Sequence, residues 1–222
     1  MVSEPLVLGF DTSAAHCAAA LLRGDRIVAA RTETMARGQA ERLMILLEEL
    51  LTEANETWAN LHAIGVGIGP GNFTGIRISV SAARGLALAL DVPAVGVSTF
   101  QALAFGLGNA VAAVKGPADK TYIQILNGQS EGAPVICGPN EFPDYPSKAE
   151  PHFVAFPSVE ALYLEAPLQP VIPLYPLAEA IARIAAARRF NVTITPPAPL
   201  YLKPADAAPS RDVPPVILDD DS

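Results

Sequence analysis

Short apolar runs separated by turn residues dominate the first part of the chain. Residues 6–10 predict a buried strand. Residues 16–22 and 27–34 predict two more strands, joined by a tight hairpin at Arg23–Arg26. Asp11–Ser13 turns the chain after the first strand. This order predicts an antiparallel meander that begins a sheet.

A helical pattern follows the meander. Over residues 39–54, Leu43, Leu47, Leu50 and Ala54 recur at three- and four-residue spacing, as on one face of a helix. The run from Leu43 to Leu47 is nevertheless apolar without interruption, which is more than one core-facing stripe uses. We therefore expect the surplus apolar surface to be covered by a second element of this chain or by another protein.

A second helix is predicted between two further strands. Residues 63–68 and 94–97 predict buried strands, and residues 75–90 predict a helix for which Thr74 is a good N-cap. A strand, a helix and a strand in this order indicate a parallel crossover. One face of this helix carries small residues that would let another helix approach closely: Gly75, Ser79, Ala82, Ala83, Leu86 and Ala89.

Weaker signals predict the elements of the second half of the chain. They are a helix over residues 99–106, strands over 110–115, 121–126 and 133–137 with a hairpin at Asn127–Gly128, and an Ala-rich amphipathic helix over 176–189. Residues 206–222 are rich in Pro and Asp and predict a mobile tail. A division near residue 100 gives an N-terminal part, residues 1–100, a C-terminal part, residues 101–205, and the tail.

Composition and charge narrow the classes of protein. Half of the residues are hydrophobic and the mean hydropathy is +0.30, which disfavours a disordered chain. We see no run of about 18 apolar residues free of charges and helix breakers, and no basic, signal-type start, so we expect a cytoplasmic protein. Cys17 and Cys137 lie in apolar surroundings and predict buried thiols.

The net charge of −8 bears on nucleic-acid binding. A protein that grips RNA by its phosphates needs a basic surface, because released counterions drive that binding. This chain has 15 Lys and Arg residues against 23 Asp and Glu residues and no basic run. Any role in RNA chemistry is therefore expected to run through a partner protein.

Two blocks of sequence carry a resemblance to a known family. The first is Leu8–Ser13, and the second is Gly65–Ile78, continuing into Arg84–Ala87 and Gly96–Thr99. The Gly-Pro-Gly-x-Phe-Thr-Gly motif with its flanks resembles the signature of the TsaB (YeaZ) family. The segments Arg37–Leu43 and Pro199–Lys203 resemble further family elements. The likeness covers most of residues 5 to 105 and is thinner beyond them.

The resemblance implies a fold and a set of partners. The fold would be an α/β architecture of two RNase H-like lobes, the ASKHA (actin-like) fold, with mixed sheets flanked by helices. The protein would be a non-catalytic scaffold that pairs with the catalytic subunit TsaD, acts with the ATPase TsaE, and touches tRNA only indirectly in N6-threonylcarbamoyladenosine formation. It would form a homodimer when alone. The two helices would supply the partner interface, with these residues: Leu43, Met44, Leu47, Leu50, Leu51, Gly75, Ser79, Ala82, Ala83 and Leu86.

The chain departs from the family pattern at three places. Gln39 stands where a His is expected, and Ile45 stands where a Pro is expected. Lys115–Pro117 replaces an Asp-Ala-Arg-type turn before the strand at 121. None of the three touches the Gly-Pro-Gly motif.

A nucleotide or anion site is the main chemical alternative to a scaffold. Asp11 follows a buried strand, as does an Asp that holds a metal-bound phosphate in ASKHA ATPases, but it also suits a turn carboxylate that caps nearby amides. The loop before the second helix would either cradle an anion or simply turn tightly, and Arg77 would assist an anion or pair with an acid such as Glu41. ATP with magnesium is the one cofactor considered, at the interface of a complex. The candidate residues are Asp11, Thr12, Gly69, Gly71, Thr74 and Gly75.

Hydrolase chemistry finds little support in the sequence. His16, His62 and His152 are scattered and form none of the pairs typical of zinc peptidases. No Gly-x-Ser-x-Gly nucleophile elbow occurs. Tyr201 and Lys203 would either reach a lobe interface or serve packing. A stand-alone ASKHA nucleotide hydrolase or kinase stays as the alternative to the scaffold, and a metal-dependent peptidase is disfavoured.

Overall fold

The computed structural model describes residues 4–127, 130–138, 141, 152–155, 170–190 and 195–202. The predictions made for Gly128, Lys203 and the tail at 206–222 lie outside these residues, as does the side chain of His152.

Five strands form the first sheet, in the order β3-β2-β1-β4-β5. They are β1 (Leu6–Asp11), β2 (His16–Arg23), β3 (Arg26–Thr34), β4 (Leu61–Gly67) and β5 (Ala94–Val97). The meander β1-β2-β3 is antiparallel, while β4 pairs in parallel with β1 and β5 in parallel with β4. The predicted strands and the predicted crossover are confirmed.

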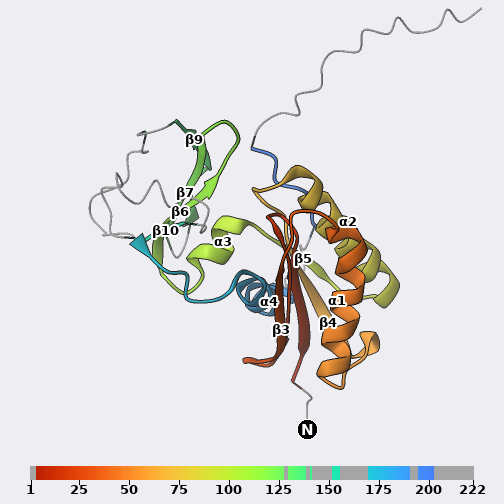
Figure 1. Ribbon diagram of the computed structural model, residues 1–222. Coiled ribbons are helices and arrows are strands. Elements are labelled where there is room, and N and C mark those ends of the chain that lie inside the picture. The colour runs from red at the N-terminus through yellow and green to blue at the C-terminus, as the bar shows by residue number, and fades with distance from the viewer. Residues whose placement is uncertain are drawn as a thin grey trace, which may run out of the picture.

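Helices cover both faces of this sheet (Figure 1). On one face lie α1 (Gln39–Glu53) and α2 (Phe73–Leu90), which are in contact with each other and with β2 and β4. On the other face lies α4 (Leu177–Arg188), which packs on β1, β2 and β4. A short 3-10 turn, η1 (Trp58–Asn60), leads into β4. The sheet is therefore sandwiched between two helical layers, each with its own buried cluster.

Two glycines let α4 lie close against the sheet. A Cβ atom at Gly9 would sit 2.5 Å from the carbonyl oxygen of Ala178, and one at Gly65 would sit 2.8 Å from the Cβ atom of Ala185. The facing side of α4 is correspondingly built of alanines. Small residues on both surfaces thus bring the helix backbone directly onto β1 and β4.

A second sheet follows helix α3 (Thr99–Ala104), in the order β11-β10-β6-β7-β8, with β9 beside β7. Its strands are β6 (Asn109–Lys115), β7 (Thr121–Asn127), β8 (Ser130–Glu131), β9 (Val135–Cys137), β10 (His152–Ala155) and β11 (Pro170–Val171). Helix α3 packs on β6 and β7. The protein thus has two lobes of mixed sheet and helix, as the sequence predicts.

The division of the chain between the lobes differs from the prediction. The second sheet begins at Asn109, close to the predicted boundary near residue 100. Helix α4, however, was assigned to the C-terminal part and instead covers the first sheet. The reason is that the first sheet has two apolar faces, and α1 and α2 cover only one of them.

Helix α2 also begins earlier than predicted. Its N-cap is Asn72, whose side chain accepts a hydrogen bond from the amide of Gly75 at 2.9 Å, so Thr74 is not the cap. Asn72 competes successfully because Asn is at least as good an N-cap as Thr. The helix therefore starts at Phe73.

By length and composition alone, α2 would be able to cross a membrane. It has 18 residues with a mean hydropathy of 1.2, and only 28% of them are buried. Arg77 and Arg84 interrupt its apolar run, which is why the sequence pattern does not suggest a span. Within the described residues it is the one helix that passes this test.

Candidate partner-binding surface

Helix α1 has a buried face and an exposed apolar face. Four of the leucines predicted to meet a partner are at most 2% exposed and belong to the core of the first lobe: Leu43, Leu47, Leu50 and Leu51. The prediction is wrong for these four, because they pack between β2 and the neighbouring helix. Met44 is 41% exposed and Ile45 is 53% exposed. The surplus apolar surface of α1 thus consists of Met44 and Ile45.

Helix α2 turns its small residues inward. The predicted small-residue face is buried at Gly75, Ser79 and Ala83 and half-buried at Ala82 and Leu86. Gly75, Ser79 and Ala83 thus face the protein's own first lobe, whereas Ala89 of the same predicted face is exposed. The exposed face lies on the opposite side and includes Phe73, Arg77, Ser81, Arg84 and Leu88.

Helices α1 and α2 lie side by side on one face of the first sheet (Figure 1). Leu88 is 86% exposed and Phe73 is 44% exposed, which adds two large apolar side chains to Met44 and Ile45. We define the α1–α2 surface by the following exposed residues: Glu41, Met44, Ile45, Glu48, Phe73, Arg77, Arg84 and Leu88. Ile45, Phe73 and Leu88 were missed by sequence reasoning, although the uninterrupted run at 43–47 signalled the first of them.

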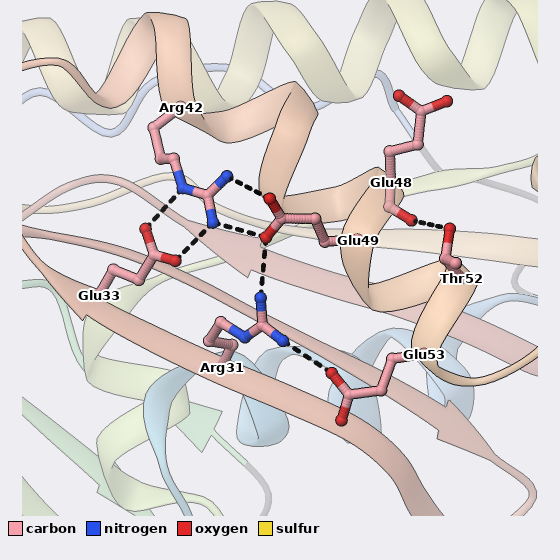
Figure 2. A network of polar contacts seen from close by, with 7 residues as sticks. All are labelled: Arg31, Glu33, Arg42, Glu48, Glu49, Thr52 and Glu53. Atoms are coloured by element: carbon pink, nitrogen blue, oxygen red, sulfur yellow. Dashed lines mark hydrogen bonds and ion pairs between the residues drawn. The ribbon is translucent and has the colours of Figure 1, made fainter.

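An ion-pair network fixes α1 against the edge strand β3 (Figure 2). The guanidinium of Arg42 donates to both carboxylate oxygens of Glu33, at 2.7 and 2.6 Å, and to both of Glu49, at 2.9 and 2.6 Å. Arg31 donates to Glu49 and Glu53, each at 2.8 Å. Bidentate pairs of this kind set orientation as well as attraction. The network therefore holds the exposed side of α1 in one orientation.

The network changes the ionisation of its members. The hydrogen bonds from Arg42 lower the pKa of Glu33 and of Glu49 below their ordinary value, and the two carboxylates raise the pKa of Arg42. Burial, followed by the nearby charge of Glu33, raises the pKa of Cys17 to about 11. These acids stay ionised at neutral pH, and the thiol stays protonated.

The exposed charges of the α1–α2 surface are acidic on α1 and basic on α2. Glu41 and Glu48 are on α1, and Arg77 and Arg84 are on α2. Within the described residues, no hydrogen bond or ion pair engages the carboxylates of Glu41 and Glu48 or the guanidinium of Arg84. The surface therefore combines exposed apolar side chains with unpaired charges of both signs, an arrangement typical of protein interfaces.

Asp11 sits in a sealed turn. Its Oδ1 atom accepts hydrogen bonds from the amide and the hydroxyl of Ser13, both at 2.9 Å, and lies 2.8 Å from His16 Nε2. Its carboxylate is fully buried, and Oδ2 lies against Gly67, where a Cβ atom would sit 1.8 Å away. Thr12 donates through Oγ1 to the carbonyl of Gly75 at 2.7 Å. This geometry is that of a turn carboxylate.

The glycine-rich loop packs on that turn. Gly71 and Gly75 lie so close to it that Cβ atoms there would sit 2.3 Å from the carbonyl oxygen of Ser13 and 1.9 Å from that of Thr12. The amides of Asn72 and Gly75 donate within the protein, to Ser13 and Asn72 respectively. Gly69 has a φ of +94°, which favours glycine. The structure thus gives the glycines a packing role.

The residues around Asp11 do not fit a magnesium ion. Magnesium prefers six oxygen ligands at about 2.0–2.1 Å, usually including several waters. Asp11 leaves one oxygen without a partner in the described part of the chain, and that oxygen is enclosed. No group of three or more His, Cys, Asp or Glu residues within the described ranges is arranged to hold a metal.

The arrangement of two lobes defines a class of protein. The fold is an α/β fold of two RNase H-like lobes, as in actin-like proteins. The ethanolamine utilization protein EutJ from Carboxydothermus hydrogenoformans superposes with a TM-score of 0.52 over 80% of this chain and 89% of its own, at 13% identity. At that identity the likeness concerns the fold alone.

Sequence comparison and a closer structural superposition relate the chain to proteins of tRNA threonylcarbamoyladenosine biosynthesis. Residues 27–119 match the family of TsaD, tRNA N6-adenosine threonylcarbamoyltransferase. The chain is 36% identical over 100 residues to the tRNA threonylcarbamoyladenosine biosynthesis protein TsaB of Escherichia coli, which is 45% of this chain and 43% of that protein. It thus spans less than half the length of this curated relative. YeaZ from Pseudomonas aeruginosa superposes over 89% of this chain and all of its own, with a TM-score of 0.73 and 29% identity. The chain is thus similar to TsaB (YeaZ) proteins in sequence over its first part and in fold over most of its length.

Proposed function

We propose that the chain is a non-catalytic scaffold subunit that pairs with TsaD in the formation of N6-threonylcarbamoyladenosine in tRNA. The observation that carries the proposal is the α1–α2 surface, where Met44, Ile45, Phe73 and Leu88 are exposed on neighbouring helices. The names of the matched relatives supply the pathway. A helix pair that exposes large apolar side chains suits a partner that offers a second helix pair.

The free energy available from burying the exposed apolar side chains favours a protein partner for the α1–α2 surface. Burying a large apolar side chain stabilises by roughly 1.5–3 kcal/mol, and Leu88 alone has 86% of its area to bury. Arg84 and Glu48 would contribute orientation, because charges at a rim set specificity more than affinity. The free surface offers the same complementary charges to a second copy of the chain. We therefore place the homodimer of the free protein on the same surface, in competition with TsaD.

In this proposal, tRNA and the ATPase TsaE bind the complex with TsaD. The net charge of −8 disfavours direct binding of tRNA phosphates. The tRNA and the ATPase TsaE would therefore be engaged by the pair and not by this chain alone. Because tRNA is modified where it is made and used, we place the protein in the cytoplasm.

The experiment is co-expression with the TsaD of the same organism, followed by size-exclusion chromatography with light scattering. We expect a one-to-one complex for the wild type and none for Leu88→Arg or Met44→Arg. Ile172→Arg is the matched control, since Ile172 is also 86% exposed but lies between β11 and α4. Leu47→Arg is unsuitable because Leu47 is in the core. Unchanged pairing of both surface variants would contradict the proposal.

A stand-alone nucleotide hydrolase or kinase is the alternative, and it rests on the position of Asp11 at the end of β1. Calorimetric titration of the isolated protein with ATP and magnesium separates the two functions. We expect no binding, because Asp11 is enclosed and its Oδ1 atom is already engaged. Micromolar binding that is lost in Asp11→Ala, with the fold retained by circular dichroism, would favour the alternative.

A further inference from the structure

Arg77 is held by two aromatic rings at the start of α2. Its guanidinium carbon lies 3.8 Å from the centre of the Phe73 ring, and its Nε atom donates a hydrogen bond to the hydroxyl of Tyr201 at 2.8 Å. The rings of Phe73 and Tyr201 stack with centroids 5.1 Å apart. Neither sequence-based expectation for Arg77, an anion in the loop or an ion pair with Glu41, describes this arrangement.

The third member of this cluster comes from the far end of the chain. Residues 195–202 run over the first lobe, where the amide of Leu200 donates to the carbonyl of Ile68 at 2.8 Å. Pro197 lies against Gly96 of β5, at 3.3 Å from the position of a Cβ atom there. These contacts fix Tyr201 beside α2, although 124 residues separate it from Arg77.

The cluster leaves one edge of the guanidinium open. The hydrogen bond to Tyr201 uses Nε, and no hydrogen bond or ion pair within the described residues uses the two terminal nitrogens of Arg77. Phe73 and Tyr201 are each 44% exposed, so the open edge is flanked by accessible aromatic surface. A planar guanidinium fork suits the two oxygens of a carboxylate. Because the side chain is already held in place, binding costs it little further rotamer entropy.

We propose that Arg77, positioned by Phe73 and Tyr201, is an anchor on the α1–α2 surface that binds a carboxylate side chain of a protein partner. The inference rests on the proposed pairing with TsaD and names the chemistry of one contact. Tyr, Arg and aromatic clusters are enriched among the residues that dominate binding energy. The terminal segment 195–202 thereby becomes part of the partner surface.

A protein carboxylate fits this site better than an RNA phosphate. Arg77 lies against the rings of Phe73 and Tyr201, and Leu88 on the same helix is 86% exposed and offers nothing to a phosphate backbone. Glu41 and Glu48 on α1 and the net charge of −8 would repel a polyanion. A partner helix with one acidic side chain among apolar ones would bury these apolar side chains and would be repelled less than a polyanion.

The test is the dissociation constant of the full-length chain for the TsaD of the same organism, measured by calorimetry at two salt concentrations. We expect Arg77→Ala to weaken binding about tenfold or more and to flatten its salt dependence. Arg77→Lys keeps the charge but loses the fork, so it should restore only part of the affinity. Tyr201→Phe removes one hydrogen bond and should weaken binding about threefold to tenfold. Arg26→Ala, which removes an exposed charge on β3, should have no effect.

The outcomes separate the anchor from the proposed function. If Leu88→Arg blocks pairing while Arg77→Ala binds like the wild type, the anchor is refuted and the scaffold stands. If the wild type does not bind TsaD, both are refuted. If Arg77→Ala weakens tRNA binding by the free chain and leaves TsaD binding unchanged, the site takes phosphate and the carboxylate assignment is wrong. Melting temperatures of the Arg77 and Tyr201 variants within a few degrees of the wild type show that the lobe is intact.

Discussion

Two glycines of the same helix are expected to respond to alanine in opposite directions. Gly75 is buried in the first turn of α2, where a Cβ atom would sit 1.9 Å from the carbonyl oxygen of Thr12 and 2.9 Å from its carbon. Both are backbone atoms, so the contact is not relieved by a side-chain rotation. Gly85 is exposed in the middle of α2, and a Cβ atom there would meet nothing within 4 Å.

The expected changes in the free energy of unfolding follow from these contacts. Overpacking costs about 1–3 kcal/mol, and separating the loop from the helix also breaks the 2.7 Å hydrogen bond between Thr12 and Gly75, worth about 0.5–1.5 kcal/mol. Gly75→Ala should therefore lower the free energy of unfolding by about 2–4 kcal/mol, and the melting temperature by roughly 5–10 °C in a chain of this size. Gly85→Ala should raise the free energy of unfolding by about 0.5–1 kcal/mol, since alanine loses less backbone entropy in a helix.

The assay is urea unfolding followed by tryptophan fluorescence. Trp58 is the single tryptophan of the chain and packs against the core of the first lobe, so its emission reports on the lobe that contains both glycines. The two variants control for each other, because they make the same substitution in the same helix. The reasoning fails if Gly75→Ala is as stable as the wild type or more stable. It fails equally if Gly85→Ala lowers the free energy of unfolding by more than about 0.5 kcal/mol. That limit is half of the helix propensity that alanine gains over glycine.

Three further predictions concern the core, the ion-pair network and the thiol. Leu46→Ala should destabilise the first lobe by about 2–5 kcal/mol in the same assay, since Leu46 is fully buried. The pKa of Glu49 is lowered by Arg42 from its ordinary value of 4.5, so the contribution of Glu49 is present above that value and is lost as the pH falls through the lower folded pKa. Glu49→Gln should accordingly lower the melting temperature at pH 7 and lose its effect in acid, and a difference that grows in acid would contradict this. Iodoacetamide should alkylate Cys17, whose pKa is raised to about 11 by burial, at least about tenfold more slowly in the native protein than in urea, as measured by mass spectrometry.

Much of the first lobe is predictable from the sequence because its signals are local. The apolar runs of β1, β2 and β4 are bounded by turn residues, and the structure reproduces them to within about two residues, the usual uncertainty of strand and helix ends. The helical pattern at 39–54 is equally local and becomes α1. The three- and four-residue spacing of apolar positions predicts that this helix has an apolar face, and it assigns Leu43, Leu47 and Leu50 to that face.

The candidate surface is less predictable because burial depends on what packs nearby. Periodicity does not tell whether the leucines of α1 or its neighbours Met44 and Ile45 meet solvent, since the answer depends on α2 lying alongside. On α2 the pattern of small residues does not tell which of them face the protein's own lobe: Gly75, Ser79 and Ala83 are buried, and Ala89 is exposed. The contact between Arg77 and Tyr201 joins residues 124 positions apart, and no local pattern reports it.

Helix α4 has a consequence for the order in which the chain acquires its structure. The strands of the first sheet end at Val97, whereas the helix that covers their second face begins at Leu177. During synthesis, the face of β1 and β4 that receives α4 stays open to water until about 80 more residues have followed, at the roughly 5–20 residues per second of translation. A ribosome-bound chain halted before Leu177 should therefore be sensitive to protease and bind chaperones, and release of the next dozen residues should close the lobe in one step. The first lobe is thus one unit in space whose two parts, the sheet and helix α4, are synthesised about 80 residues apart.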